Sequence, residues 1–78
     1  MSFQELKKRW LAVERAKEEH TRLCRNATSA TIEAAGMDLY AARLSLREAQ
    51  ERASQRTLSR LSKFIRSTKI EKANVIAA

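Results

Sequence analysis

Residues 26–38, with the sequence NATSATIEAAGMD, contain both candidate positions for the single turn expected in this chain of 78 residues. Gly36 is its only glycine, and glycine readily adopts the left-handed conformation that ends many helices. Asp38 has the side chain of a helix N-cap, so we expect one helix to end before Gly36 and the next to begin after Asp38. The alternatives are an earlier turn, with Asn26 closing one helix and Ser29 opening the next, and a single uninterrupted helix.

The composition favours helices along the whole chain. There is no proline, and residues with high helix propensity, such as Ala, Leu, Arg and Glu, dominate. Ser2 and Glu5 have the spacing of a capping box, which starts the first helix at Phe3. The sequence therefore predicts an all-α fold, an antiparallel two-helix hairpin with coiled-coil-like packing. Its expected parts are a hairpin domain at residues 1–66, with helices at about 3–35 and 39–66, and a C-terminal tail at 67–78 that frays or docks on a neighbour.

A chain this short needs a source of stability beyond its own core. Cys24 is the only cysteine and His20 the only histidine, so an internal disulfide is excluded and a four-ligand metal site is incomplete. We therefore predict no cofactor and no metal, and expect two hairpins to pair into a homodimeric helical bundle. The chain starts without the apolar core of a secretory signal and has no apolar run of membrane-spanning length, so we expect it in the cytoplasm.

Apolar residues recur at three- and four-residue spacing along both predicted helices, which is the pattern of helix–helix packing. Trp10 lies in this series and is expected to anchor the core or an interface. Leu11 points away from the series and marks an exposed apolar flank. The residues assigned to the helix–helix or oligomer interface are Leu6, Trp10, Val13, Leu23, Met37, Leu44, Leu46, Leu58, Leu61 and Ile65.

Positive charge is concentrated in the second half of the chain. Residues 1–39 have seven basic and six acidic side chains, whereas residues 40–78 have nine basic and three acidic ones. On one continuous helix, the spacing of the basic residues places them within about a third of the circumference, opposite Leu58, Leu61 and Ile65. The predicted contact site for a nucleic acid or an acidic partner consists of Arg52, Arg56, Arg60, Lys63 and Arg66.

Three interpretations of this basic stripe remain open. It is a solvated outer face with no ligand, a contact for nucleic-acid phosphates, or a basic amphipathic helix for an acidic protein or an anionic membrane. The sequence shows no paired catalytic carboxylates, glycine-rich phosphate loop or metal-ligand cluster, so we expect no enzyme. The leading expectation is a small helical interaction module that docks on a protein partner. The alternatives are a nucleic-acid-binding accessory protein and, less favoured, a membrane-surface protein.

Overall fold

Three α-helices make up the part of the chain that the structure describes. The computed structural model describes residues 2–77, and the side chains of residues 2–71. The helices are α1 (Phe3–Asn26), α2 (Ser29–Arg52) and α3 (Gln55–Ala77). The all-α prediction is confirmed, but the chain forms three helices in place of the predicted two. The predicted end of the second helix near residue 66 is also wrong, because α3 continues to Ala77.

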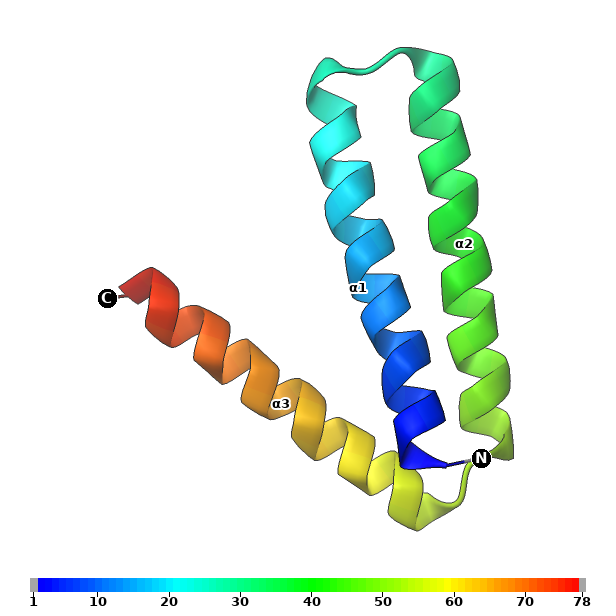
Figure 1. Ribbon diagram of the computed structural model, residues 1–78, viewed down its shortest axis with the longest axis vertical. Coiled ribbons are helices and arrows are strands. Elements are labelled where there is room, and N and C mark those ends of the chain that lie inside the picture. The colour runs from blue at the N-terminus through cyan, green and yellow to red at the C-terminus, as the bar shows by residue number, and fades with distance from the viewer. Residues whose placement is uncertain (1, 78) are drawn as a thin grey trace.

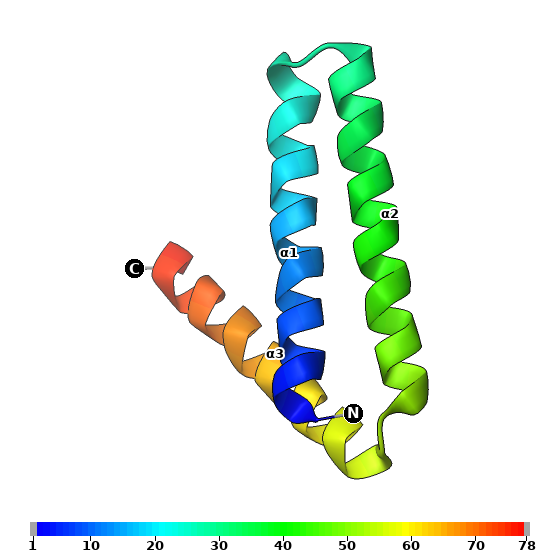
Figure 2. The same cartoon turned by 45° about the vertical axis from the view of Figure 1, so that its right-hand side comes forward.

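The helices form a flat arrangement in which α3 diverges from an antiparallel hairpin. Figures 1 and 2 show α1 and α2 side by side, while α3 leaves the lower end of α2, crosses the start of α1 and runs away from it. Most of the packing is between α1 and α2, and α3 packs against α1. The molecule measures 42 × 36 × 13 Å along its principal axes, so it is about one helix thick. A single layer leaves much of each helix exposed.

The hairpin turns at Ala27 and Thr28, not at Gly36. Ala27 and Thr28 have extended backbones, and the Thr28 hydroxyl accepts a hydrogen bond from the Thr31 amide at 3.4 Å. Asn26 therefore ends α1 and Ser29 begins α2, as in the earlier-turn alternative. Polar caps prevail here because they satisfy backbone groups that a helix end exposes.

Gly36 lies inside α2, beside an imidazole that leaves enough room for a Cβ atom. A Cβ atom at this position would lie 3.7 Å from Nε2 of His20 on α1. The backbone of Gly36 has no positive φ, so the left-handed cap that the sequence suggested does not form. An interior glycine lowers helix stability by roughly 1 kcal/mol relative to alanine, which is too little to break a helix that is packed and capped.

A second break, which the sequence analysis did not predict, separates α2 from α3. Ala53 is extended, and the Ser54 hydroxyl accepts a hydrogen bond from the Thr57 amide at 3.3 Å. The same chemistry opens α2, where Thr28 precedes Thr31. The capping residues Ser2, Thr28 and Ser54 thus recur every 26 positions, since 28 − 2 and 54 − 28 are both 26. Each helix begins with the same type of hydroxyl cap.

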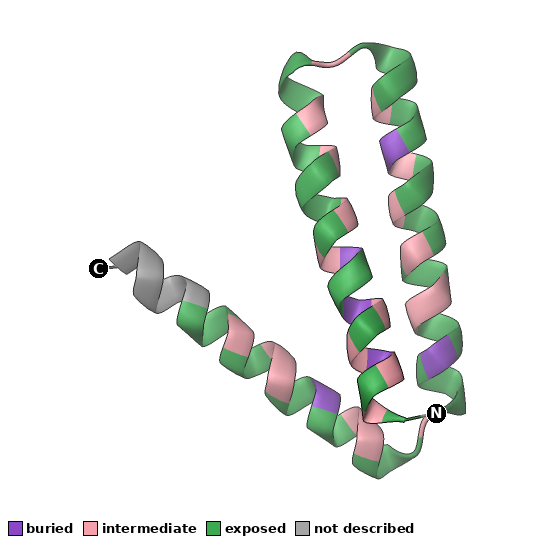
Figure 3. Cartoon of the chain, viewed as in Figure 1, coloured by how far each residue is buried: buried purple, intermediate pink, exposed green. Residues whose placement is uncertain are grey.

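The core lies where the three helices meet, at the end of the hairpin opposite its turn. Leu6 and Trp10 of α1, Ala49 of α2 and Leu61 of α3 form its buried cluster. Figure 3 shows buried positions on α1 near the chain's N-terminus, on the side of α2 that faces α1, and near the start of α3. Farther along the hairpin, burial depends on Val13 and Ala35. The small residues of α2 let the two helices approach closely but bury little apolar area.

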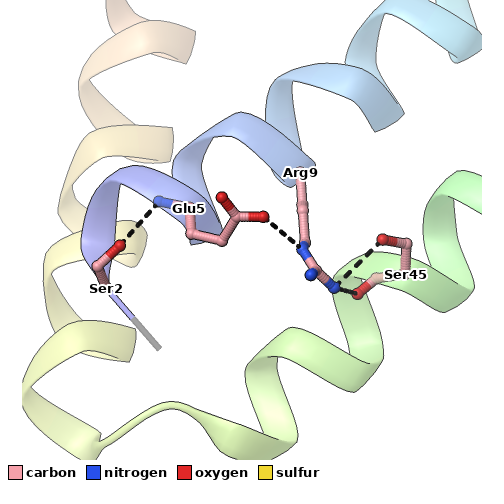
Figure 4. A network of polar contacts seen from close by, with 4 residues as sticks. All are labelled: Ser2, Glu5, Arg9 and Ser45. Carbon is pink, nitrogen blue, oxygen red and sulfur yellow. Dashed lines mark hydrogen bonds and ion pairs between the residues drawn. The ribbon is translucent and has the colours of Figure 1, made fainter.

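A polar network joins the start of α1 to α2 beside this core. The Ser2 hydroxyl accepts from the Glu5 amide at 3.2 Å, which confirms Ser2 as the cap of the first helix. The Glu5 carboxylate accepts from Arg9 Nε at 3.2 Å, and Arg9 Nη1 donates to the Ser45 carbonyl at 3.1 Å (Figure 4). Arg9 therefore fixes the start of α1 to the middle of α2.

We expect Gly36→Ala to stabilise the chain, because the new methyl group meets His20 at an ordinary contact distance and alanine favours the helix. The gain should be up to about 1 kcal/mol, or a rise in Tm of about 4–8 °C for a domain of this size. Ala34→Gly, at an exposed position in the same helix, is the matched control and should lower Tm. A thermal melt followed by circular dichroism measures both. A lower Tm for Gly36→Ala would show that the methyl group does not fit beside His20 and would contradict this expectation.

Candidate interaction surfaces

The sequence-predicted basic stripe is divided between two helices. Arg52 is the last residue of α2, whereas Arg56, Arg60, Lys63 and Arg66 lie on α3. All five side chains are exposed. Because the break at Ala53 and Ser54 interrupts the helix, Arg52 does not continue the line of the other four. The basic face of the molecule is therefore a feature of α3 alone.

The packing of the apolar side of α3 against the core determines which way its basic side faces. Leu61 is buried in the core, and Leu58, Phe64 and Ile65 pack against it from the same helix. At about 100° per residue, Arg56, Lys63 and Arg66 fall on the opposite side of α3. The packing on α1 thus turns these three cations toward solvent. Because the apolar side of α3 packs in the core, less of it is free to contact a membrane surface.

Two cations at the α1–α3 contact are held by aromatic rings. The guanidinium of Arg60 lies over the Phe3 ring, 4.4 Å from its centroid. The ammonium of Lys7 lies over the Phe64 ring at 4.7 Å. Cation–π contacts of this kind contribute about 0.5–1 kcal/mol at exposed sites. Arg60 therefore has a structural contact, whereas Arg56, Lys63 and Arg66 extend from the outer face of α3.

The charges of α3 differ from those of the hairpin. The ion pairs that join two described side chains lie within α1 or α2, at Glu5–Arg9, Glu14–Lys17, Glu19–Arg22 and Arg47–Glu51. In contrast, α3 has six basic residues and one acidic residue, Glu71. Arg56, Lys63 and Arg66 have no acidic residue within four positions, so they cannot form the usual pairs along a helix.

The outer face of α2 has large apolar side chains that are exposed in the described part of the chain. Met37 is 73% exposed, Tyr40 69% and Leu44 43%. With the exposed Ala41 they are spaced i, i+3, i+4 and i+7, which places them along one side of the helix. The opposite side, with Ala35 and Ala49, is buried. We call Met37, Tyr40, Ala41 and Leu44 the α2 stripe.

The structure distributes the predicted interface residues over three environments. Trp10 and Val13 are already buried within one chain, so they do not offer a free surface to a second one. Met37 and Leu44 face solvent, and their place in an interface between chains stays a prediction. The full distribution is Leu6, Trp10, Val13 and Leu61 buried, Leu23, Leu46, Leu58 and Ile65 half-buried, and Met37 and Leu44 exposed.

The polar groups outside these surfaces include one close cysteine–histidine pair. Cys24 Sγ lies 3.9 Å from both ring nitrogens of His20, and no group of three or more metal-ligating side chains occurs among the described residues. The groove between α1 and α3 is open and lined by Trp10, Leu11, Glu14, Arg15, Glu18 and Thr68. Leu11, the predicted apolar flank, lies in this groove. Within residues 2–77, none of the helices combines the length and apolar character that a bilayer crossing needs.

Comparison with known proteins gives no match: no family model fits the sequence, and no curated protein or solved structure is significantly similar to it. The two exposed surfaces, the α2 stripe and the outer face of α3, therefore provide the basis for assigning a function.

We expect Phe64→Ala to detach α3 from α1, because the Phe64 ring packs edge-on against Trp10 at 5.5 Å and Phe3 at 6.3 Å. Phe64 is half-buried, so the loss of stability should be about 1–3 kcal/mol, below the 3–5 kcal/mol typical of a fully buried phenylalanine. The emission of Trp10, the only tryptophan, should shift to the red. Ile70→Ala, on the exposed side of α3, is the control and should leave the emission unchanged. Equal spectra for both variants would contradict this role of Phe64.

Proposed function

We propose that this chain is a small non-enzymatic interaction module that acts by docking one helix face on a protein partner. The observation that carries the proposal is the exposed α2 stripe. Helix-docking surfaces present anchors at i, i+3, i+4 and i+7, and this is the spacing of Met37, Tyr40, Ala41 and Leu44. Large apolar side chains gathered on one exposed helix face are typical of interaction sites.

The hairpin holds α2 in place for such docking. Thr28 caps its first turn, Arg9 bonds to Ser45 in its middle, and Ala49 is buried near its end. A helix that is already ordered loses less conformational entropy on binding than a free peptide does. The α2 stripe is therefore a preorganised surface, and α1 supplies the support behind it.

A pull-down from host extract tests the proposal. The wild-type chain should retain one stoichiometric protein after nuclease treatment, because helix docking needs no nucleic acid. Met37→Ser with Leu44→Ser should abolish retention, since it removes two of the anchors while leaving the core intact. The matched control is Leu11→Ser with Ile70→Ser, two exposed apolar residues outside the stripe, and it should retain the partner. Loss of retention on nuclease treatment, or equal retention by both double variants, would contradict the proposal.

A second candidate function, contact with nucleic-acid phosphates, is favoured by the outer face of α3. Arg56, Lys63 and Arg66 lie on one side of a helix that stands apart from α2 and has only one acidic residue. Basic side chains in such an array release counterions when they contact phosphates. Tyr40 and the other aromatic residues of the chain lie outside α3's exposed face, so stacking on single-stranded bases is not supported. The contact would be directed at the backbone and tolerant of sequence.

Duplex DNA binding as a function of salt tests this second candidate. The wild-type affinity should fall steeply with salt, and Arg56→Glu with Lys63→Glu and Arg66→Glu should reduce the slope of log K against log salt by about 3. Arg60 is left unchanged because it packs on Phe3. The matched control changes Lys8, Arg15 and Arg25, exposed on α1, to glutamate and makes the same change in net charge. Equal weakening by both triple variants, or no binding at low salt, would contradict a role for α3.

A further inference from the structure

We propose that the α2 stripe binds the α2 stripe of a second copy of this chain, with the two helices antiparallel. This inference rests on the proposed helix-docking function and names the partner. A twofold axis would pass near Tyr40 and Ala41, at the middle of the stripe. The resulting layer would have the order α1, α2, α2, α1, with both α3 helices at the outer ends.

The spacing of the stripe is the same when it is read in either direction. Reversal about its midpoint places Met37 opposite Leu44 of the second copy. Tyr40 and Ala41 lie on opposite edges of the stripe, so at the axis the two tyrosine rings meet on one edge and the two small Ala41 side chains on the other. A symmetric dimer requires such a self-complementary patch. A stripe that binds an unrelated helix has no such requirement.

The charges on one edge of the stripe are complementary in the antiparallel orientation. Glu33, Tyr40 and Arg47 are seven residues apart, so they lie nearly in line along α2. Antiparallel pairing brings Glu33 of each chain to Arg47 of the other, which forms two favourable pairs. Among the described residues Arg47 pairs with Glu51 at 3.7 Å, with both side chains largely exposed, and a weak pair of this kind is readily exchanged.

The opposite edge of the stripe is compatible with the same arrangement. Ala34, Ala41 and Glu48 are also seven residues apart and lie along this edge. Antiparallel pairing places Glu48 beside Ala34 of the second copy, so its carboxylate faces a small side chain. Neither edge therefore brings like charges together in the antiparallel dimer.

The net charge of each helix indicates why two copies would meet at α2. The chain has a net charge of +7, which opposes self-association in general. Among the helices, α2 has three basic and four acidic residues, whereas α1 has seven basic and four acidic and α3 six basic and one acidic. The outer face of α2 is also open, since α1 covers its other side and α3 lies beyond α1 (Figures 1 and 2). A second copy reaches this face without meeting α3.

Analytical ultracentrifugation over a range of micromolar concentrations tests the dimer. The wild-type chain should show a concentration-dependent monomer–dimer equilibrium. Met37→Ser with Leu44→Ser should be monomeric, whereas Leu11→Ser with Ile70→Ser should still dimerise. Circular dichroism checks that the helices are retained, as expected for changes at exposed positions. A wild-type monomer up to millimolar concentration, or equal dimerisation by both double variants, would overturn the inference.

Charge exchange tests the antiparallel orientation. Glu33→Arg alone should raise the dimer dissociation constant about tenfold, because two attractive pairs in each dimer become repulsive. Arg47→Glu alone should have a similar effect. The double variant Glu33→Arg with Arg47→Glu restores opposite charges only in the antiparallel dimer, so it should recover most of the wild-type affinity. A double variant as weak as the single ones would overturn the antiparallel arrangement.

The outcomes separate this inference from the proposed function. A wild-type monomer whose α2 stripe still retains a different protein after nuclease treatment overturns the inference and leaves the helix-docking function in place. A monomer that retains no protein through the stripe overturns both. A dimer that is lost with Met37→Ser and Leu44→Ser supports both, since the second copy is then the docked partner.

Discussion

The position of α3 depends on the ring of Phe64, which packs edge-on between the aromatic side chains of Phe3 and Trp10. Leu6 and Leu61 are buried beside these rings, and Lys7 covers the Phe64 ring from α1. This junction lies at the end of the hairpin opposite its turn, so α3 is held near its start and diverges from α1 beyond it (Figure 1). The aromatic contact sets the direction of α3 and, with it, the side on which its cations are exposed.

A molecule one helix thick has no second layer to cover its outer faces. In a compact three-helix bundle, each helix would turn a broad apolar side inward. Here α2 contacts α1 on one side only, so Met37, Tyr40 and Leu44 remain exposed although α2 is well ordered by its caps and by Arg9. The exposed face of α3 is basic for a different reason, because the six basic residues of α3 are accompanied by one acidic residue, Glu71. The two surfaces thus offer different chemistry, apolar docking on α2 and anion contact on α3.

The sequence predicted features that depend on local chemistry more accurately than those that depend on contacts between helices. The helical class and the cap at Ser2 followed from propensity and from a single hydroxyl. The caps at Thr28 and Ser54 use the same chemistry, each with a threonine three positions later, and this recurrence was the missed signal for three helices. Gly36 was misassigned because α2 continues through it, with its cap at Thr28 and its buried side at Ala35 and Ala49. Arg52 was wrongly placed in the basic stripe because the break at Ala53, which was not predicted, puts it on a different helix from Arg56.

The two proposed surfaces are compatible with each other because they lie on opposite sides of α1. Repulsion between two strongly basic chains is screened over a Debye length of about 8 Å at physiological ionic strength. The molecule extends 36 Å along its second axis, and α3 lies on the side of α1 away from α2 (Figures 1 and 2). Pairing through α2 would therefore keep the two α3 helices well apart and leave the outer faces of both exposed. A dimer of this form would present two basic faces to one polyanion, and linked sites bind more tightly than either site alone when the polyanion can reach both.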